Sequence, residues 1–350
     1  MSEATMTAPY SGPLFDVQAH AVMPKSVAMM SAAIRSGSFL SEDTKRIIIE
    51  DIFAKAADDL QSDFRREAAG TEGIQVVTVN MAFPELPPEQ LIDIFEATNK
   101  WMAEKVAGQR HLIGTAVLPP VPALAAAGSA PDGNTWLEKA LLSLRIAIEE
   151  QGLRGIMASS HYDGTFLGAS MFEPFFGLAE ELRAPFIIHP AVTSAETALV
   201  PRKLIPIDSG YLNDQRTALL DIVKAGILER HPDLTIIATH LGGGILTSLG
   251  RFDQLANRFP DEHWYMDAEG HRSELREPVS SYLKRIYYDC NNAEKADILH
   301  AASMVGIDHL LTGTDFPWAT DVFTRKVLGS LEPLTAQKIA FENASKLFRR

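Results

Sequence analysis

The sequence predicts an α/β protein with a closed (β/α)8 barrel. Eight short apolar runs of strand length recur along its 350 residues, and segments with the 3.6-residue periodicity of amphipathic helices separate most of them. The runs are continuously apolar rather than alternating, which is typical of parallel strands covered by helices. Polar side chains follow several of the runs, as they do at the mouth of such a barrel. Periodicity alone also allows an open doubly wound sheet.

The predicted strands are short and are spaced widely enough for a helix to lie between most neighbours. In chain order they are residues 14–18, 74–80, 112–118, 155–158, 185–189, 234–240, 286–290 and 309–314. The predicted helices carry apolar residues three and four positions apart, which places those residues on one face. They are residues 89–106, 136–151, 171–182, 214–229 and 293–304, and residues 335–348 are expected to form a closing helix.

The segment between the first two strands, residues 19–73, is unusually long and contains a charged helical stretch at 41–66. We expect it to be an insertion or lid over the site. Residues 1–13 are mostly small and polar, and they are predicted to be a flexible N-terminal tail. Because no linker, composition break or internal repeat marks a second domain, residues 14–350 are expected to form a single domain.

Composition excludes several classes of partner. The 45 acidic and 32 basic residues give a net charge of −13, so the chain has no general attraction to nucleic acid or to anionic lipid. No apolar run reaches the length of about 18 residues that a membrane-spanning helix needs. The single cysteine excludes an internal disulfide framework and suits a reducing compartment, so a cytoplasmic protein is predicted.

Histidine, glutamine and aspartate side chains gather at the predicted strand ends. Gln18 and His20 follow the first strand, His189 the fifth, His240 the sixth and Asp315 the eighth. Because the carboxyl ends of parallel barrel strands meet at one end of the barrel, we expect these side chains to lie together. Two imidazoles and a carboxylate from separate strands are typical of an open site for one divalent metal ion.

Each of these features also has a purely structural interpretation. A histidine at a strand end can simply bond a neighbouring loop. Asp315, in Leu311-Thr-Gly-Thr-Asp-Phe-Pro-Trp318, can cap a helix or start a turn before the proline. The three glycines at 242–244 can expose amide donors to an anion, or they can make a tight turn between strand and helix.

Several motifs carry a family resemblance. They are Asp16-Val-Gln-Ala-His20, Phe186-Ile-Ile-His-Pro190, His231-Pro-Asp-Leu-Thr-Ile-Ile-Ala-Thr-His-Leu-Gly-Gly-Gly244 and Leu311-Thr-Gly-Thr-Asp-Phe-Pro317. With Ala97-Thr-Asn99, Gly152-Leu-Arg-Gly155 and Glu342-Asn-Ala-Ser-Lys-Leu-Phe348, they extend over nearly the whole chain from Leu14. The sequence therefore resembles the amidohydrolase-2 family, which includes the aminocarboxymuconate semialdehyde decarboxylases and related hydroxybenzoate decarboxylases.

The resemblance implies a distorted, amidohydrolase-like TIM barrel that holds one divalent metal ion (Zn, Mn or Mg). Its metal ligands would be Gln18, His20, His189 and Asp315, with His240 as a catalytic residue and Asp315 acting in catalysis as well. The fourth predicted strand ends in Met157-Ala-Ser-Ser160. Because this stretch supplies no lysine for a bridging carbamate, a two-metal hydrolase site is not expected.

Gln18 departs from the family pattern, in which His or Glu is more common at this position. An amide oxygen is a harder and weaker ligand than imidazole. The affinity of the site for zinc should therefore fall, and its affinity for Mn²⁺ or Mg²⁺ should rise relative to that for zinc. With His20 and His189 neutral and Asp315 ionised, the site keeps about one positive charge, which favours an anionic substrate. The alternative is that Gln18 does not bind metal and that the chemistry is altered or lost.

Three kinds of group are expected at the substrate. Aromatic side chains could sandwich a planar ring, a glycine amide could bind an anion, and basic side chains could neutralise a second anion. The candidates are Phe83, Phe316, Trp318, Gly242, His161 and either Arg216 or Arg251. The alternative is ordinary core packing for the aromatic residues and a solvated surface for the charged ones.

We therefore predict a metal-dependent, non-oxidative decarboxylase of a small hydroxylated aromatic or muconate-like carboxylic acid. The metal would act as Lewis acid and template. Asp315 would transfer the proton at the carbon that loses CO₂, and His240 would polarise or exchange a proton with the ring oxygen. The alternatives are a hydrolase of a lactone, amide or C–C bond that uses metal-bound water, and a metal-free small-molecule binder. A homodimer is expected by analogy with other barrels.

Overall fold

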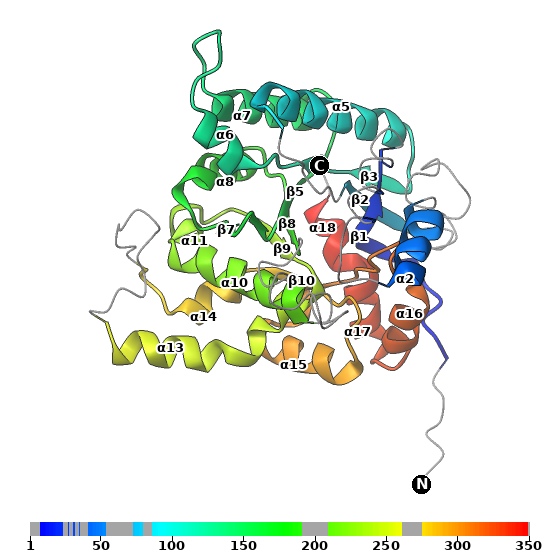
Figure 1. Ribbon diagram of the computed structural model, residues 1–350. Coiled ribbons are helices and arrows are strands. Elements are labelled where there is room, and N and C mark those ends of the chain that lie inside the picture. Colours follow the sequence, from blue (N-terminus) through cyan, green and yellow to red (C-terminus); the bar gives the residue numbers. More distant parts are fainter. Residues whose placement is uncertain are drawn as a thin grey trace.

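The computed structural model describes residues 8–23, 27, 31, 35, 41–53, 73–79, 86–190, 209–260 and 275–348. Its central strands are parallel and lie inside a layer of helices (Figure 1). These strands are β1 (Phe15–Ala21), β2 (Ile74–Val79), β3 (Leu112–Gly114), β4 (Ala116–Val117), β5 (Ile156–Ser159), β8 (Phe186–His189), β9 (Ile236–Ala238), β10 (Tyr287–Asp289) and β11 (Leu310–Leu311). All eight predicted strands are present, with ends that differ by a few residues.

Two connections join the sheets into a ring. One sheet has the order β1-β2-β3 and the other β11-β10-β9-β8-β5-β4. β3 and β4 belong to one extended segment interrupted at Thr115, which pairs with β2 on one side and with β5 on the other. On the opposite side, parallel bridges join Asp16 to Thr312 and Ala19 to Phe316. The ladder therefore runs round the whole molecule, and the predicted barrel is confirmed.

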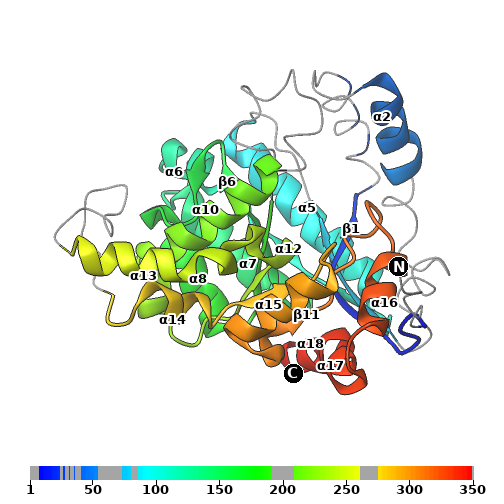
Figure 2. The ribbon, with the colours of Figure 1, turned by 90° about the horizontal axis from the view of Figure 1, so that it is seen from below.

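The described helices lie around this ring, and most of them cover its outside in both ribbon views (Figures 1 and 2). They are α2 (Glu42–Ile47), η2 (Ile48–Ile52), α5 (Pro88–Val106), α6 (Val121–Ala127), α7 (Trp136–Glu149), η3 (Ser170–Phe172), α8 (Glu173–Glu181), α10 (Tyr211–Lys224), α11 (Ile227–Arg230), α12 (His240–Gly243), η6 (Ile245–Ser248), α13 (Leu249–Arg258), α14 (Val279–Leu283), α15 (Lys295–Val305), η7 (Ile307–His309), α16 (Asp321–Gly329), α17 (Pro333–Gln337), η8 (Lys338–Glu342) and α18 (Asn343–Leu347).

Local sequence explains where several helices begin and end. α7 starts at a capping box, in which Thr135 Oγ1 accepts from the Glu138 amide at 3.1 Å and the Thr135 amide donates to Glu138 Oε2 at 2.6 Å. The predicted helix at 214–229 is two helices, because Gly226 takes a left-handed φ of +76° between α10 and α11. The predicted closing helix is built from α17, η8 and α18.

The C-terminal segment closes one end of the barrel. Phe348, which follows α18, stacks on Phe15 at the start of β1 with ring centroids 5.6 Å apart. The same apolar cluster contains Val17, Ile187 and Ile237 from three barrel strands. Since the strands begin at this end, their polar carboxyl ends lie at the opposite end.

The chain on either side of β1 contacts the segments that follow β11. In the described part of the predicted tail, residues 8–13, the Tyr10 amide donates to Arg325 O at 2.8 Å and Arg325 donates to Gly12 O at 2.8 Å. These bonds join residues 8–13 of the predicted flexible tail to α16. Residues 1–7 lie outside the described residues.

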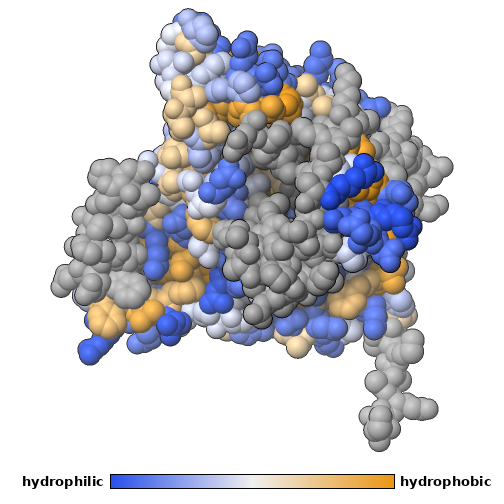
Figure 3. Space-filling view, viewed as in Figure 1, coloured by the Kyte–Doolittle hydropathy of each residue, from blue (hydrophilic) through white to orange (hydrophobic). Residues whose placement is uncertain are grey.

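The insertion after β1 is described at residues 41–53, where α2 continues into η2. α2 lies to one side of the barrel (Figure 2), and hydrophilic residues cover its outer surface (Figure 3). Phe53 meets Trp318 edge-on, with ring centroids 6.3 Å apart. The insertion therefore contacts the loop after β11, while most of the rest of the expected lid falls outside the described residues. None of the described helices is long and apolar enough to cross a membrane.

Candidate active site

Side chains from β1, β8 and the loop after β11 converge at the carboxyl ends of the strands. His20 Nε2 lies 2.8 Å from Asp315 Oδ1, and His189 Nε2 lies 3.6 Å from the same oxygen. One ligand atom from each of the three residues lies within 4.8 Å of the other two. Within the described ranges this is the one group of three or more His, Cys, Asp or Glu residues with such geometry. The position of these residues at the ends of the predicted strands thus identified side chains that the fold brings together.

Second contacts orient the two imidazoles. His189 Nδ1 lies 2.7 Å from the carbonyl oxygen of Pro190, which can only accept, so Nδ1 carries a proton. His20 Nδ1 lies 3.0 Å from Thr78 Oγ1, whose own hydrogen goes to Ala19 O at 3.3 Å. Both Nδ1 atoms therefore act as donors, and each Nε2 faces Asp315. This is the arrangement in which a histidine presents Nε2 to a metal ion.

The carboxylate of Asp315 is stabilised as the anion. Burial alone would raise its pKa, but hydrogen bonds and charge from His189 and His20 outweigh that effect and hold the pKa well below its usual range. A donor hydrogen on either Nε2 makes that imidazole cationic, because Nδ1 is already protonated. A divalent cation can take the place of these protons, so the cluster fits a metal ion in charge as well as in spacing.

His240 lies beside the cluster and is neutral. Its ring centroid is 5.4 Å from that of His189, and its Nε2 is 3.0 Å from Gln18 Nε2. Because the amide nitrogen is a donor, His240 Nε2 accepts this hydrogen bond. Burial lowers the pKa of His240 to about 4, since desolvation disfavours the imidazolium more than the charge of Asp315 favours it. His240 is therefore neutral at pH 7, and its Nε2 is available as a hydrogen-bond acceptor.

Gln18 is almost completely buried, with 1% of its surface exposed. Its Nε2 donates to Asp315 Oδ1 at 3.1 Å as well as to His240. The structure thus brings Gln18 to the predicted ligands, but with its amide nitrogen rather than its oxygen towards them. Its Oε1 is buried without a hydrogen-bond partner among the described residues.

The predicted substrate-contacting residues lie in different settings. His161, on β6 (His161–Tyr162), accepts from the Gly164 amide at 3.2 Å through Nδ1, and its Nε2 is 3.5 Å from Asp214 Oδ2. β6 pairs with β7 (Thr165–Phe166) in a hairpin that follows β5. Phe316 is buried, whereas Trp318 is 43% exposed. Phe83 lies outside the described residues.

The structure corrects the predicted anion-binding role of Gly242. Its amide donates to Thr239 O at 2.9 Å, and a Cβ at this position would lie 2.8 Å from both Leu219 and Tyr288. Gly242 therefore allows a tight turn to pack on the core and offers no amide to a ligand. For Gly242, this contact agrees with the tight-turn interpretation.

Neither candidate arginine is positioned by the structure as an anion ligand. Arg216 Nη2 donates to Ser248 Oγ at 2.5 Å, and the guanidinium lies over the ring of Phe252 at 5.9 Å. Arg251 is exposed on α13. The guanidinium of Arg216 is thus already engaged by packing and a hydrogen bond, and Arg251 has the solvated surface position that its helical pattern allows.

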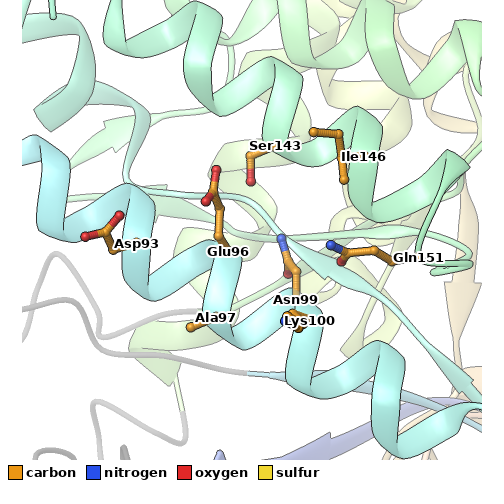
Figure 4. A pocket seen from close by; sticks show the side chains of 8 residues that line it. All are labelled: Asp93, Glu96, Ala97, Asn99, Lys100, Ser143, Ile146 and Gln151. Atoms are coloured by element: carbon orange, nitrogen blue, oxygen red, sulfur yellow. The ribbon is translucent and has the colours of Figure 1, made fainter. Parts of the chain in front are cut away.

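A separate cavity of about 430 Å³ lies in the outer helical layer. Helices α5 and α7 form most of its wall (Figure 4). The lining residues are Asp93, Glu96, Ala97, Asn99, Lys100, Ser143, Ile146 and Gln151. None of them belongs to the cluster at the strand ends, so this cavity is distinct from the candidate active site.

Two residues of the site were missed in the sequence. Thr78 stands near the end of β2 and orients His20, and Asp289 ends β10 and accepts the backbone amide of His240 at 2.9 Å. Burial raises the pKa of Asp289 to about 8. Both residues stand near the carboxyl end of a strand, as His189 does, so their position alone could have marked them. A single Thr or Asp in an apolar run, however, does not show which residue it bonds.

Comparison with known proteins identifies the family of the chain. The family Amidohydro_2, described as amidohydrolase, matches residues 75–350. A 2-amino-3-carboxymuconate-6-semialdehyde decarboxylase of Dictyostelium discoideum is 24% identical over 232 residues, which are 66% of this chain and 58% of that protein. A gamma-resorcylate decarboxylase of Rhizobium sp. (strain MTP-10005) is 23% identical over 329 residues, 83% of this chain and 88% of that one. The chain thus matches little more than half of the first relative and most of the second.

Solved structures of decarboxylases share the fold. A 5-carboxyvanillate decarboxylase from Sphingomonas paucimobilis superposes with a TM-score of 0.79 at 16% identity, covering 96% of this chain and 99% of that one. A 5-carboxyvanillate decarboxylase of Novosphingobium aromaticivorans, complexed with manganese and a nitrobenzoic acid, gives 0.78 at 18% identity and covers 99% of each chain. These similarities confirm the amidohydrolase-type TIM barrel. By its sequence motifs, by the extent of the family match and by its fold, the chain belongs to the amidohydrolase family Amidohydro_2.

Proposed function

We propose that the protein is a metal-dependent carboxy-lyase that removes CO₂ from a small hydroxylated aromatic or muconate-like acid. The observation that carries this proposal is the convergence of His20, His189 and Asp315, with ligand atoms within 4.8 Å of one another, next to neutral His240. The relatives named above are decarboxylases, and the Novosphingobium structure contains manganese and an aromatic acid. Both facts support the same reaction class.

The donor set fits one divalent ion. His20, His189 and Asp315 would hold it through two imidazole nitrogens and one carboxylate oxygen, with Gln18 as a further ligand. Such an ion supplies Lewis-acid stabilisation of negative charge on substrate oxygens and orients those oxygens. Nitrogen and oxygen donors of this kind suit Mn²⁺ or Zn²⁺, and the amide oxygen of Gln18 would favour Mn²⁺ or Mg²⁺. The remaining positive charge favours a carboxylate substrate.

The protein's own groups move the proton. Asp315 enters the reaction as a carboxylate because its pKa is held below the usual range. It accepts the proton of the substrate hydroxyl and delivers it to the ring carbon that carries the carboxylate. The C–C bond then breaks, CO₂ leaves, and the electron pair restores the aromatic ring as a phenolate, which takes a proton from solvent. His240 would relay this last proton, which its Nε2 accepts from solvent and then donates to the phenolate oxygen.

Residues around the cluster would select the substrate. Because His161 Nδ1 accepts from a backbone amide, the proton of the neutral ring is on Nε2, which can donate to an anionic group. Phe316 and Trp318, which lie within three residues of Asp315, supply aromatic surface for a planar ring. These assignments stay proposals, together with the aromatic contact expected from Phe83.

The first test combines metal content with product analysis. The purified chain is loaded with Mn²⁺ or Zn²⁺, its metal content is measured, and CO₂ release is followed from a panel of ortho-hydroxylated benzoic acids in H₂¹⁸O. We expect one ion per chain, CO₂ equal to product, and no ¹⁸O in the ring product. His189→Ala serves as the comparison and should lose both the ion and the activity.

Other results would contradict the proposal in distinguishable ways. Incorporation of ¹⁸O into the product of a lactone or amide without CO₂ release would identify a hydrolase. A chain that takes up no metal, but binds aromatic acids equally well with and without a chelator, would be a small-molecule binder.

A further inference from the structure

We infer that Asp289 is a positioning residue for the metal centre and that it acts through the side-chain amide of Gln18. In the cation-bound state the amide turns over, so that Gln18 Nε2 donates to Asp289 Oδ2 and Gln18 Oε1 faces the ion. This inference rests on the metal site proposed above. It assigns a role to a buried carboxylate that the proposed reaction does not use.

In the structure, Gln18 directs its amide nitrogen towards the cluster. Its Nε2 donates to Asp315 Oδ1 at 3.1 Å and to His240 Nε2 at 3.0 Å. The two amide hydrogens thus occupy the acceptors that an ion and a substrate hydroxyl would otherwise contact. In this orientation the one atom of Gln18 that can ligate metal, Oε1, points away from the cluster.

Asp289 has one engaged oxygen and one that lacks a donor. Its Oδ1 accepts the backbone amides of His240 at 2.9 Å and Asn291 at 3.0 Å, and these two bonds fix the plane of the carboxylate. Its Oδ2 is fully buried and finds no hydrogen-bond partner among the residues that the structure describes. When the carboxyl is ionised, this buried oxygen needs a donor.

Gln18 Oε1 and Asp289 Oδ2 face the same small space over Gly313. A Cβ built on Gly313 would lie 3.0 Å from Gln18 Oε1 and 2.6 Å from Asp289 Oδ2. Gln18 Oε1 is an acceptor, and Asp289 Oδ2 is one when its carboxyl is ionised, the form that a nearby cation favours. Neither atom has a hydrogen-bond partner within the described part of the chain. A half-turn about the last torsion of Gln18 exchanges its oxygen and nitrogen, which places N–H groups in this space and supplies the missing donor.

The turn is coupled to the cation by charge. Once turned, Gln18 Oε1 would lie beside Asp315 Oδ1, and two acceptors at that separation repel each other unless a positive ion lies between them. Without the ion, the orientation with nitrogen towards Asp315 is favoured. With the ion, Asp289 accepts the Gln18 amide and holds the oxygen in the ligating position. A glutamate at position 18 would not need this partner, because both of its side-chain oxygens can ligate.

The test is the affinity for Mn²⁺ of Asp289→Asn, measured by electron paramagnetic resonance of the free ion. The amides of His240 and Asn291 keep the oxygen of the introduced amide in the Oδ1 position, so the new nitrogen stands where Oδ2 was and donates to Gln18 Oε1. That bond holds Gln18 in the orientation that does not ligate. We expect the Kd for Mn²⁺ to rise by about tenfold or more, and the rise in Tm on adding Mn²⁺ to shrink accordingly.

The matched control repeats Asp289→Asn in a Gln18→Glu chain. The introduced amide can donate to either oxygen of a glutamate, so the same substitution should change the Kd for Mn²⁺ by less than about twofold. Equal losses in both backgrounds would overturn the inference, because they would show a general structural effect. Unchanged affinity in Asp289→Asn would overturn it as well. A wild-type chain that does not bind Mn²⁺ would instead overturn the metal site itself.

A second measurement uses the unaltered chain, in case Asp289→Asn does not fold. In protein labelled with ¹⁵N-glutamine, the Gln18 side-chain amide is the resonance that disappears in Gln18→Glu. We expect this resonance to shift on addition of Zn²⁺, which is diamagnetic, as the amide leaves Asp315 and His240 for Asp289. If Zn²⁺ binds and the resonance does not move, Gln18 keeps one orientation and the inference is wrong.

Discussion

Two residues of the candidate site, His240 and Asp315, have left-handed backbone conformations with φ of 51° and 62°. Such a conformation costs about 1–2 kcal/mol for a residue other than glycine. Hydrogen bonds from the backbone amides hold it in place, because the amide of His240 donates to Asp289 Oδ1 at 2.9 Å and the amide of Asp315 donates to Gln18 O at 2.8 Å. The chain thus reverses at once after β9 and bends sharply after β11. Strain of this kind is concentrated at functional sites.

The first prediction at this scale concerns the proton-transferring groups. Asp315→Asn and His240→Asn leave a polar side chain in place but remove the ability to carry the proton. We expect decarboxylation to fall by about 10²- to 10⁴-fold in each variant, with Tm close to that of the parent chain. The measurement is CO₂ release at saturating substrate. Activity above about a tenth of the parent value in Asp315→Asn would contradict the assigned role.

At the scale of elements, the turn after β9 fits closely against α10. A Cβ on Gly243 would lie 2.0 Å from the carbonyl oxygen of Leu212 in the first turn of that helix. Gly244, one residue further along, would meet no atom within 4 Å. Both glycines have left-handed φ, of 63° and 77°. A substitution at Gly244 therefore tests the cost of the left-handed backbone alone, whereas one at Gly243 also tests the steric contact with α10.

Alanine at these two positions gives a matched prediction for stability. Gly244→Ala should lower the free energy of unfolding by about 1 kcal/mol, the cost of a left-handed alanine. Gly243→Ala adds a collision with backbone, so its loss should be at least twice as large. Denaturation in urea measures both. Equal losses would show that α10 moves aside at no cost.

A second contact between elements joins α8 to the end of α11 through Glu173. Arg230 donates to both carboxylate oxygens, at 2.7 and 2.5 Å, and His231 Nε2 lies 3.0 Å from Oε1. Burial on its own would raise the pKa of Glu173, but the hydrogen bonds and charge of Arg230 lower it overall. A carboxyl whose pKa is lower in the folded protein stabilises the fold above its unfolded pKa and loses that contribution as the pH falls.

Glu173→Gln should therefore destabilise the protein in a pH-dependent way. At pH 7 we expect a loss of at most about 1 kcal/mol, because the side chain of Arg230 is about half exposed and water screens the pair. The difference should shrink as the pH falls below about 4 and Glu173 in the parent chain becomes protonated. Urea denaturation of both chains at several pH values measures it. A difference that does not change with pH would rule out the charge as its cause.

At the scale of the whole molecule, Asp16 joins the first strand of the barrel to the last. Its carboxylate accepts the amide of Thr314 at 2.9 Å, the hydroxyl of Thr314 at 2.6 Å and Gln75 Nε2 at 3.2 Å. Burial raises the pKa of Asp16 to about 7, because the carboxyl is completely enclosed. These bonds lie where the parallel bridge between Asp16 and Thr312 closes the ring.

Removing this carboxyl should weaken the barrel more than neutralising it. Asp16→Ala leaves several buried donors without acceptors, and we expect a loss of about 3 kcal/mol or more. Asp16→Asn keeps one oxygen for the amide of Thr314, and the hydroxyl of Thr314 can rotate to accept, so its loss should be less than half as large. Thermal unfolding followed by circular dichroism measures both. Similar losses in the two variants would contradict the closing role of these hydrogen bonds.

The architecture was predictable because parallel strands and their covering helices leave a periodic apolar pattern. All eight strands were placed correctly, and α5 and α7 differ from the predicted 89–106 and 136–151 by at most two residues. Element ends were less predictable, since they depend on pairing and on single residues such as Gly226. Within the predicted helical stretch at 41–66, residues 42–53 are helical, and residues 54–66 lie outside the described residues. A single domain and a homodimer stay predictions.

The sequence by itself determined which residue types stand at the strand ends, since strand length and polarity are local properties. From these it predicted the barrel, the family and the grouping of Gln18, His20, His189, His240 and Asp315. Only the tertiary structure decided how those side chains are oriented, because orientation depends on partners far away in the chain. Asp289 and Thr78 became part of the site in this way, Gly242 lost its predicted role, and Gln18 turned its nitrogen towards Asp315. Hydrogen bonds across the barrel have no local pattern in sequence, so the fold alone fixes them.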